Sequence, residues 1–214
     1  IKPFDNDALY DLFTRLDFSK LKEKFNLKPP APSELQDIAA VKWHQETTLK
    51  ELIAICRKSE LVSFIAAGNL DVLCLITGED GYTVSGMNYG REAYEKFLKE
   101  FFGAGVKKAS HGIKAVMSTL LYCGISFDDF IYDTALAAYL LNPNEGGYTL
   151  QKAAYSLLAR SLPDTTYESH DAFSFFEMDA DTLATLQTHA LAVRDMYQYT
   201  SSLLSSQGMD DLFY

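Results

Sequence analysis

The chain has 214 residues, of which 48% are hydrophobic and 22% charged, a composition typical of one well-cored globular domain with room for a small appendage. The formal net charge is −10, from 19 basic and 29 acidic residues. It argues against a free-standing nucleic-acid-binding module, because such modules gather Lys and Arg against phosphates. No apolar run is long enough to span a bilayer and no signal peptide opens the sequence, so we expect no membrane partner.

Two short amphipathic segments come first, and a proline-rich stretch follows them. Apolar side chains recur at helical spacing over residues 9–16 and 18–25. Residues 28–32 contain three prolines, and such a stiff, extended segment predicts a linker. The predicted divisions are therefore an N-terminal appendage over 1–27, the linker, and one main domain over 33–214.

In the first half of the main domain, the spacing of apolar residues changes from that of a helix to that of strands. Capping boxes occur at residues 33–36 and 48–51, and the second precedes an amphipathic helix that ends near Lys58. Segments with strand character follow at 61–67, 72–77 and 82–85. The first two are apolar on both faces and so belong inside a covered sheet. We expect a hairpin turn at 78–81 and a helix over 91–102.

A further strand and two helices are expected next. Residues 107–110 form a candidate strand, and apolar residues at helical spacing over 113–121 predict a helix that Gly124 ends. Asp133 is placed to cap a second helix over 134–141, which is apolar nearly all round and is therefore expected to be buried. The order β-β-β-α-β-α predicts an α/β domain.

The C-terminal third is predicted to be helical around one loop. Thr149 can cap a helix that runs to about residue 159. Residues 161–179 are polar and rich in turn formers, so we expect a surface loop anchored by its phenylalanines. Apolar residues then mark one face of a long helix over 183–206, which Gly208 closes.

The cysteines and histidines show no metal-ligand spacing. Each of the three cysteines lies in an apolar or amphipathic stretch, which predicts reduced core thiols in a cytoplasm: Cys56, Cys74 and Cys123. We expect no metal binding by the four histidines, which are His44, His111, His170 and His189. For His189, which aligns with a tyrosine of the family described below, we expect a structural role.

Lys107, Lys108 and Lys114 form the densest basic patch in the sequence. Such a patch can contact a DNA backbone, or it can be the solvated rim of a buried strand. The overall acidity of the chain favours the solvated rim.

Two consecutive runs carry a resemblance to a known family: SHGIKAVMSTLLYCGI and YDTALAAYLLNPNEGGYTLQKAA. They resemble the second half of the 3′-5′ exonuclease domain of bacterial family A DNA polymerases, the DNA polymerase I family. In that family a lysine-containing helix, a Phe/Tyr-Asp-Thr turn and an Ala-Ala-Tyr-Leu-Leu helix ending in Asn/Asp-Pro follow one another, as they do from His111 to Pro143. The resemblance implies a ribonuclease-H-like 3′-5′ exonuclease fold, with a mixed central sheet flanked by helices.

Active members of that family hold two divalent metals with carboxylates. The resemblance implies an Asp-x-Glu pair ending the first strand, an Asp in the helix after the His/Asn-Ile-Lys run, and a Tyr-x-x-x-Asp on a late helix. The positions that align with these motifs carry Ile65, Ala67, Val116, His189 and Val193. Apolar side chains offer no oxygen to magnesium, so the resemblance implies no catalytic residue and no metal ligand here. A shifted alignment does not restore the pair, because no acidic residue lies between Glu60 and Asp71.

The resemblance also implies a larger parent protein. That parent is a DNA-directed DNA polymerase, a nucleotidyltransferase of replication and repair in the bacterial cytoplasm, with a Mg²⁺-dependent polymerase domain downstream of Tyr214. Residues 1–27 look like the C-terminal tail of its 5′ nuclease region, and residues 33–214 like an inactive, structural exonuclease domain. The expected partners are these neighbouring domains, and DNA through the full-length polymerase.

Two alternatives remain open at the level of the sequence. One is an active metal-dependent 3′-5′ exonuclease, for proofreading or similar to ribonuclease D, with ligands elsewhere in the chain. The other is an independent DNA-binding module, against which the charge of −10 argues.

Overall fold

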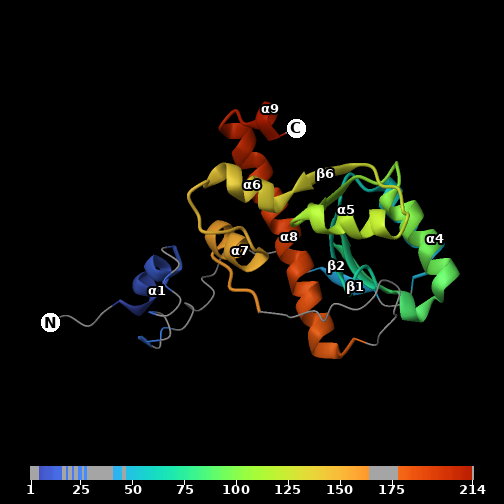
Figure 1. Ribbon diagram of the computed structural model, residues 1–214, viewed down its shortest axis with the longest axis horizontal. Helices are drawn as coiled ribbons and strands as arrows, with labels where there is room; N and C mark the ends of the chain where they lie inside the picture. Colours follow the sequence, from blue (N-terminus) through green and yellow to red (C-terminus); the bar gives the residue numbers. More distant parts are fainter. Residues whose placement is uncertain are drawn as a thin grey trace.

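The structure is a computed structural model that describes residues 5–15, 18, 21, 24, 25, 27, 41–44, 47–163 and 178–213. Its centre is a six-stranded mixed sheet (Figure 1). In spatial order the strands are β1 (Lys42–His44), β4 (Asp80–Ser85), β3 (Val72–Thr77), β2 (Val62–Ala67), β5 (Lys108–Ser110) and β6 (Phe130–Asp133). β3 runs antiparallel to its two neighbours, β4 and β2, while β1 joins β4, β5 joins β2 and β6 joins β5 in parallel. This confirms the predicted α/β domain with a mixed sheet.

Helices flank the sheet on both faces (Figure 1). The described helices are α1 (Asn6–Arg15), α3 (Leu49–Lys58), α4 (Arg91–Phe102), α5 (Ile113–Tyr122), α6 (Thr134–Leu141), α7 (Leu150–Leu158), α8 (Ala180–Ser206) and the short α9 (Asp210–Phe213), with a 3₁₀ turn at Gly86–Asn88, and α1 lies apart from the sheet (Figure 1). Among the described helices, none is long and apolar enough to cross a membrane.

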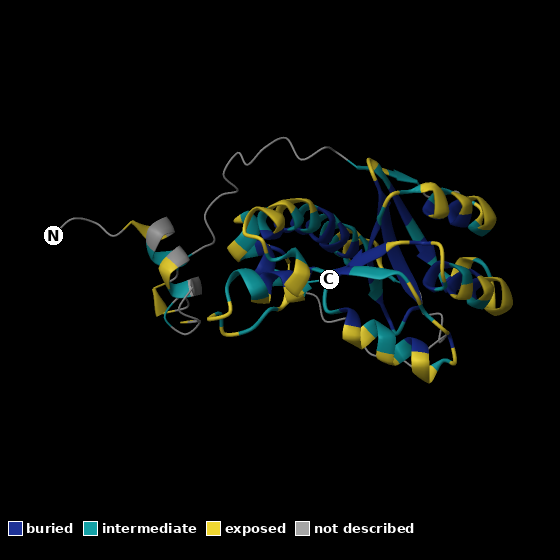
Figure 2. Cartoon of the chain, turned by 90° about the horizontal axis from the view of Figure 1, so that it is seen from above, coloured by how far each residue is buried: buried dark blue, intermediate teal, exposed yellow. Residues whose placement is uncertain are grey.

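Alternate residues of the central strands enter two different hydrophobic cores. Phe64 of β2 packs with Phe101 and Phe102 of α4, and this first core also includes side chains of α3 and α5. Ile65 and the other odd positions of β2 face α7 and α8 in a second core. Because both faces are covered, the buried residues run along the middle strands and the inner side of α8 (Figure 2).

The predicted helix caps form as the sequence indicates. Thr48 and Glu51 make a complete capping box at the start of α3. Thr149 accepts a hydrogen bond from the backbone N–H of Lys152 and so caps α7. Gly124 follows α5 with a φ of 67°, a left-handed conformation that favours glycine.

Several predicted boundaries differ from the structure. Strands β1 and β6 are not predicted by the hydrophobic pattern, because segments of three and four residues give too little periodicity. The hairpin is tighter than expected, since β4 begins at Asp80 and only two residues join it to β3. The prediction that α6 is buried all round is wrong in part, because Leu136 and Tyr139 are 45% and 47% exposed.

Gly81 is required by the edge of the sheet. A Cβ atom there would lie 2.6 Å from Val41 and 2.7 Å from the ring of Trp43. Glycine therefore lets β1 pair against β4. The linker at 28–32, the capping box at 33–36 and residues 164–177 of the expected loop lie outside the described residues.

Candidate functional site

Four of the five side chains at the motif positions meet between β2 and α8. Ile65 and Ala67 extend from the same face of β2, 8% and 3% exposed, and Val193 of α8 is fully buried in the same core. His189 lies one helical turn before Val193 and is 2% exposed. Apolar side chains of α8 therefore pack directly against those of β2.

His189 is held by the backbone. Its Nε2 atom lies 3.0 Å from the carbonyl oxygen of Pro163. Because a carbonyl oxygen only accepts, Nε2 carries the proton and donates. This nitrogen therefore points to the chain between α7 and α8, in a structural role.

Val116 does not join the other four. It is half-buried on α5 and packs against the first core, which contains Phe64 and the phenylalanines of α4. Ile65, the next residue after Phe64, belongs to the second core. The sequence aligns Val116 with a metal ligand, yet the structure packs it apart from Ile65, Ala67 and Val193.

The cluster does not fit a magnesium or manganese centre. Hard divalent cations require oxygen ligands, and the side chains of Ile65, Ala67 and Val193 provide none. In the part of the chain that the structure describes, no group of three or more His, Cys, Asp or Glu residues could hold a metal ion.

Two aspartates that follow the motif positions in the sequence have other partners. Asp195 of α8 pairs with Arg194 at 2.7 Å and with Arg160 at 2.8 Å. Asp133 accepts hydrogen bonds from the backbone N–H groups of Gly112, Ile113 and Ala135 at 2.8 to 2.9 Å. Both carboxylates are thereby committed to holding secondary structure together.

A buried polar network ties the ends of β5 and β6 to the chain before α7. Ser110 donates to the carbonyl of Phe64 at 2.7 Å, and His111 Nε2 lies 2.8 Å from the carbonyl of Tyr148. The other ring nitrogen of His111 lies 2.9 Å from the hydroxyl of Thr134. Burial lowers the pKa of His111, so the neutral imidazole is favoured at neutral pH. The hydrogen bonds of His111 thus link β5, α6 and the chain before α7.

The interpretation of the basic patch as a solvated rim is wrong for Lys108. This side chain is fully buried, and its ammonium group donates to the carbonyl oxygens of Gly103 and Val106. The rings of Phe101 and Phe130 lie 5.8 and 5.5 Å from the nitrogen. Burial lowers the pKa of Lys108 to about 8, against the opposing charges of Asp129 and Asp128. The side chain in the middle of the predicted patch therefore lies in the core and not at the surface.

Two of the three cysteines are core residues, as predicted. Burial raises the pKa of Cys56 and of Cys74 to about 12, so both are protonated at neutral pH. Cys123 is half-buried at the end of α5, and all three thiols are free.

The comparisons with known proteins identify the fold. No protein-family model matches the sequence, and no curated protein sequence matches it. Solved structures match it over most of its length with TM-scores above 0.5. The fold is that of the ribonuclease-H-like 3′-5′ exonucleases.

Three of these structures illustrate the likeness. The POL domain of Pol1 from M. smegmatis, in complex with a DNA primer-template and dNTP, has a TM-score of 0.63 and 20% identity over 80% of this chain. The EXO domain of Nibbler from Aedes aegypti has a TM-score of 0.59 and 11% identity over 84% of this chain. RNase D of Escherichia coli, an exoribonuclease involved in structured RNA processing, has a TM-score of 0.58 and 11% identity over 78%.

The solved structures differ widely in the fraction of their own length that this chain covers. This chain spans 29% of the M. smegmatis polymerase chain and 46% of RNase D, but 95% of the Nibbler EXO domain. The chain therefore matches only part of the polymerase and RNase D chains, but nearly all of the Nibbler EXO domain. At these identities the likeness concerns the fold alone.

Proposed function

We propose that this chain is the exonuclease-like domain of a family A DNA polymerase I, catalytically inactive and structural in role. The observation that carries the proposal is the dry packing of Ile65, Ala67 and Val193 at positions that align with metal ligands. The similarity of fold to the M. smegmatis Pol1 chain supports the assignment to a polymerase.

The physical argument rests on what two-metal hydrolysis requires. One metal activates the attacking water while the second stabilises the leaving oxygen, and carboxylates must hold both. Aliphatic side chains at three of the ligand positions instead stabilise the fold, since burying a large one contributes about 1.5 to 3 kcal/mol. A cluster of carboxylates without metals would be destabilised by like-charge repulsion.

The domain organisation follows from the same proposal. Residues 1–27 would be the tail of a 5′ nuclease region, residues 28–32 a linker, and residues 33–214 the exonuclease-like domain. The parent would be a DNA-directed DNA polymerase of replication and repair, with Mg²⁺ in its polymerase domain and none held by this fragment. The acidity of the fragment argues that DNA binding resides mainly in the parent.

The competing function is an active, metal-dependent 3′-5′ exonuclease, for proofreading or like ribonuclease D. The observation in its favour is the fold, which this chain has in common with RNase D of Escherichia coli. It requires at least three carboxylates that converge beside β2.

Calorimetric titration with manganese distinguishes the two functions. We expect no binding heat from the 214-residue protein, and a 5′-labelled single strand should stay intact at high protein concentration with manganese present. A catalytically competent exonuclease of this fold, assayed in parallel, controls for the metal and the substrate. Metal binding together with stepwise shortening from the 3′ end would establish the exonuclease and overturn the proposal.

A further inference from the structure

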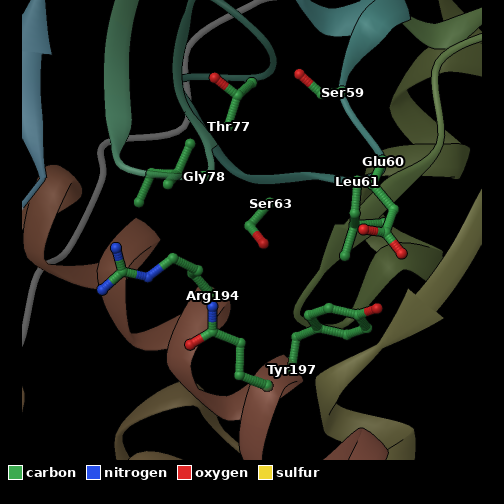
Figure 3. Close-up of a pocket in the computed structure, with 10 residues that line it drawn as sticks. Ser59, Glu60, Leu61, Ser63, Thr77, Gly78, Arg194 and Tyr197 are labelled. Carbon is green, nitrogen blue, oxygen red and sulfur yellow. The ribbon is translucent and has the colours of Figure 1, made fainter. Parts of the chain in front are cut away.

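An open pocket of about 420 Å³ lies beyond Ile65, where β2 begins and β3 ends (Figure 3). Its floor is formed by Ser63 and by Ile76 of β3, and α8 forms one wall. Ser63 lies two residues before Ile65 and hence on the same face of β2. The volume falls in the range of small-molecule sites and is too small for a folded partner.

Three polar side chains line this pocket without internal partners. Ser63 is 3% exposed, and Figure 3 shows its side chain projecting into the space between Gly78, Leu61 and α8. Neither its hydroxyl nor the amide of Gln198 has a hydrogen-bond partner among the described residues. The carboxylate of Glu60, at the exposed rim, likewise accepts no hydrogen bond from that part of the chain.

The aromatic wall of the pocket is Tyr197, which lies beside Glu60. Its ring packs against a small hydrophobic cluster and makes an edge contact with Tyr132, with centroids 4.9 Å apart. Figure 3 shows Glu60 and the Tyr197 ring on the same side of the pocket. Burial, and then the charge of Glu60, raise the pKa of Tyr197. A flat ligand could therefore lie against Tyr197 and still reach Glu60.

Charge at the pocket argues against an anionic ligand. Arg194 is in the lining, but its guanidinium contacts Asp195 through Nε at 2.8 Å and through a terminal nitrogen at 2.7 Å. Asp195 is also paired with Arg160. The guanidinium of Arg194 is thereby paired with a carboxylate, and Glu60 is the exposed charge among the lining residues, so a phosphate beside it would gain little.

We propose that this pocket binds a neutral purine nucleoside of the adenosine type. Its three functional groups match common modes of recognition. A Gln amide can bond adenine through both N6 and N7, a carboxylate accepts hydrogen bonds from ribose hydroxyls, and a tyrosine ring packs against the base. Ser63 offers one further donor and acceptor at the floor. The proposal does not depend on the function proposed above, because nucleoside binding needs no metal and no nuclease chemistry.

The test is calorimetry of the 214-residue protein with adenosine, inosine, 2′,3′-dideoxyadenosine and AMP. Adenosine should bind most tightly. Inosine lacks the N6 amino group and dideoxyadenosine lacks both ribose hydroxyls, so each should bind about tenfold more weakly, which corresponds to one charged or bidentate contact. AMP should also bind more weakly, because its phosphate would lie in the same pocket as the carboxylate of Glu60.

Variants locate the binding. Gln198→Leu and Glu60→Gln should each weaken adenosine binding about tenfold, and both side chains are exposed, so both variants should fold. Glu92→Gln, an equally exposed change on α4 outside the pocket, should leave binding unchanged. No binding of adenosine at millimolar concentration overturns the proposal. So does equal binding by the Gln198 and Glu60 variants, or tighter binding of AMP than of adenosine.

Discussion

The ammonium group of Lys108 is held by two backbone carbonyls and lies near two aromatic rings, inside the first core. Desolvation disfavours its charged form, and the carboxylates of Asp128 and Asp129 only partly compensate. The folded pKa of about 8 is therefore below the ordinary 10.5 of lysine. A group of this kind makes stability depend on pH in the alkaline range.

The sign of that dependence can be tested with Lys108→Met. Between pH 8 and 10.5 the unfolded chain holds the Lys108 proton more tightly than the folded chain, so this group makes stability rise with pH. Cys56 and Cys74 act in the opposite direction above their unfolded pKa of 9, so the window to measure is pH 8 to 9. Urea unfolding should give a less positive pH slope for the variant than for the wild type, and identical slopes would contradict the assignment.

Ile65 and Val116 align with equivalent ligands but differ in burial, which predicts unequal effects of aspartate. Ile65→Asp places a charge in a dry core and should lower the free energy of unfolding by more than about 3 kcal/mol. Val116→Asp should cost less than half of that, because Val116 is half-buried and a carboxylate there can reach water. Urea unfolding of the two variants makes the comparison. Equal losses in the free energy of unfolding would contradict the difference in burial between Ile65 and Val116.

At the scale of elements, one carboxylate joins two helices. Asp133 ends β6, caps α6 through the N–H of Ala135, and also accepts from Gly112 and Ile113 at the start of α5. The first-turn N–H groups of both helices thus have a charged acceptor, which the helix dipole favours. The Asp-Thr turn therefore fixes how α5 and α6 leave neighbouring parallel strands.

Asp133→Ala should accordingly destabilise the domain more than the loss of an ordinary cap. We expect a loss of about 2 to 4 kcal/mol, because three backbone donors lose a charged acceptor. Thr149→Ala removes the cap of α7 alone and should cost about 1 kcal/mol. Thermal and urea unfolding of both variants provide the measurement. A Thr149 effect as large as that of Asp133 would contradict the double cap.

At the scale of the whole molecule, the hydrophobic cores lie in the part of the chain that begins at β1, where Val41 and Trp43 pack against the second core. Every buried hydrophobic residue among those described lies at Leu52 or beyond. Helix α1 contacts this part of the chain through Tyr10, whose ring lies 5.7 Å from that of Tyr155 in α7. The N-terminal helix is thus an appendage in energetic terms as well as in sequence.

Removal of residues 1–40 tests this organisation. The shortened protein should fold, with a free energy of unfolding within about 1 kcal/mol of the full chain, because none of the described residues that are removed is a buried core residue. Urea unfolding followed by tryptophan fluorescence is suitable, since Trp43 is retained. A loss of several kcal/mol would show that the appendage belongs to the core.

The sequence by itself determined the regular elements and their order. Helices α3 to α8 and strands β2 and β3 have periods long enough to be recognised, and Thr48, Asp133 and Thr149 act as the caps that their local pattern predicts. The absence of carboxylates between Glu60 and Asp71 is likewise a fact of the sequence. That the aligned positions are lost metal ligands stays a prediction.

The tertiary structure alone decided which side chains meet and which are buried. Lys108 is buried because α4 and β6 bring Phe101 and Phe130 around it. The residues next to Lys108 in the sequence do not predict its contact with these rings. Val116 and Ile65 are separated because neighbouring residues of β2 point to opposite faces of a sheet covered on both sides. The pocket at Ser63 likewise needs α8, more than 100 residues later in the chain, to form its wall. Local pattern sets periodicity and capping, but burial depends on contacts between distant segments.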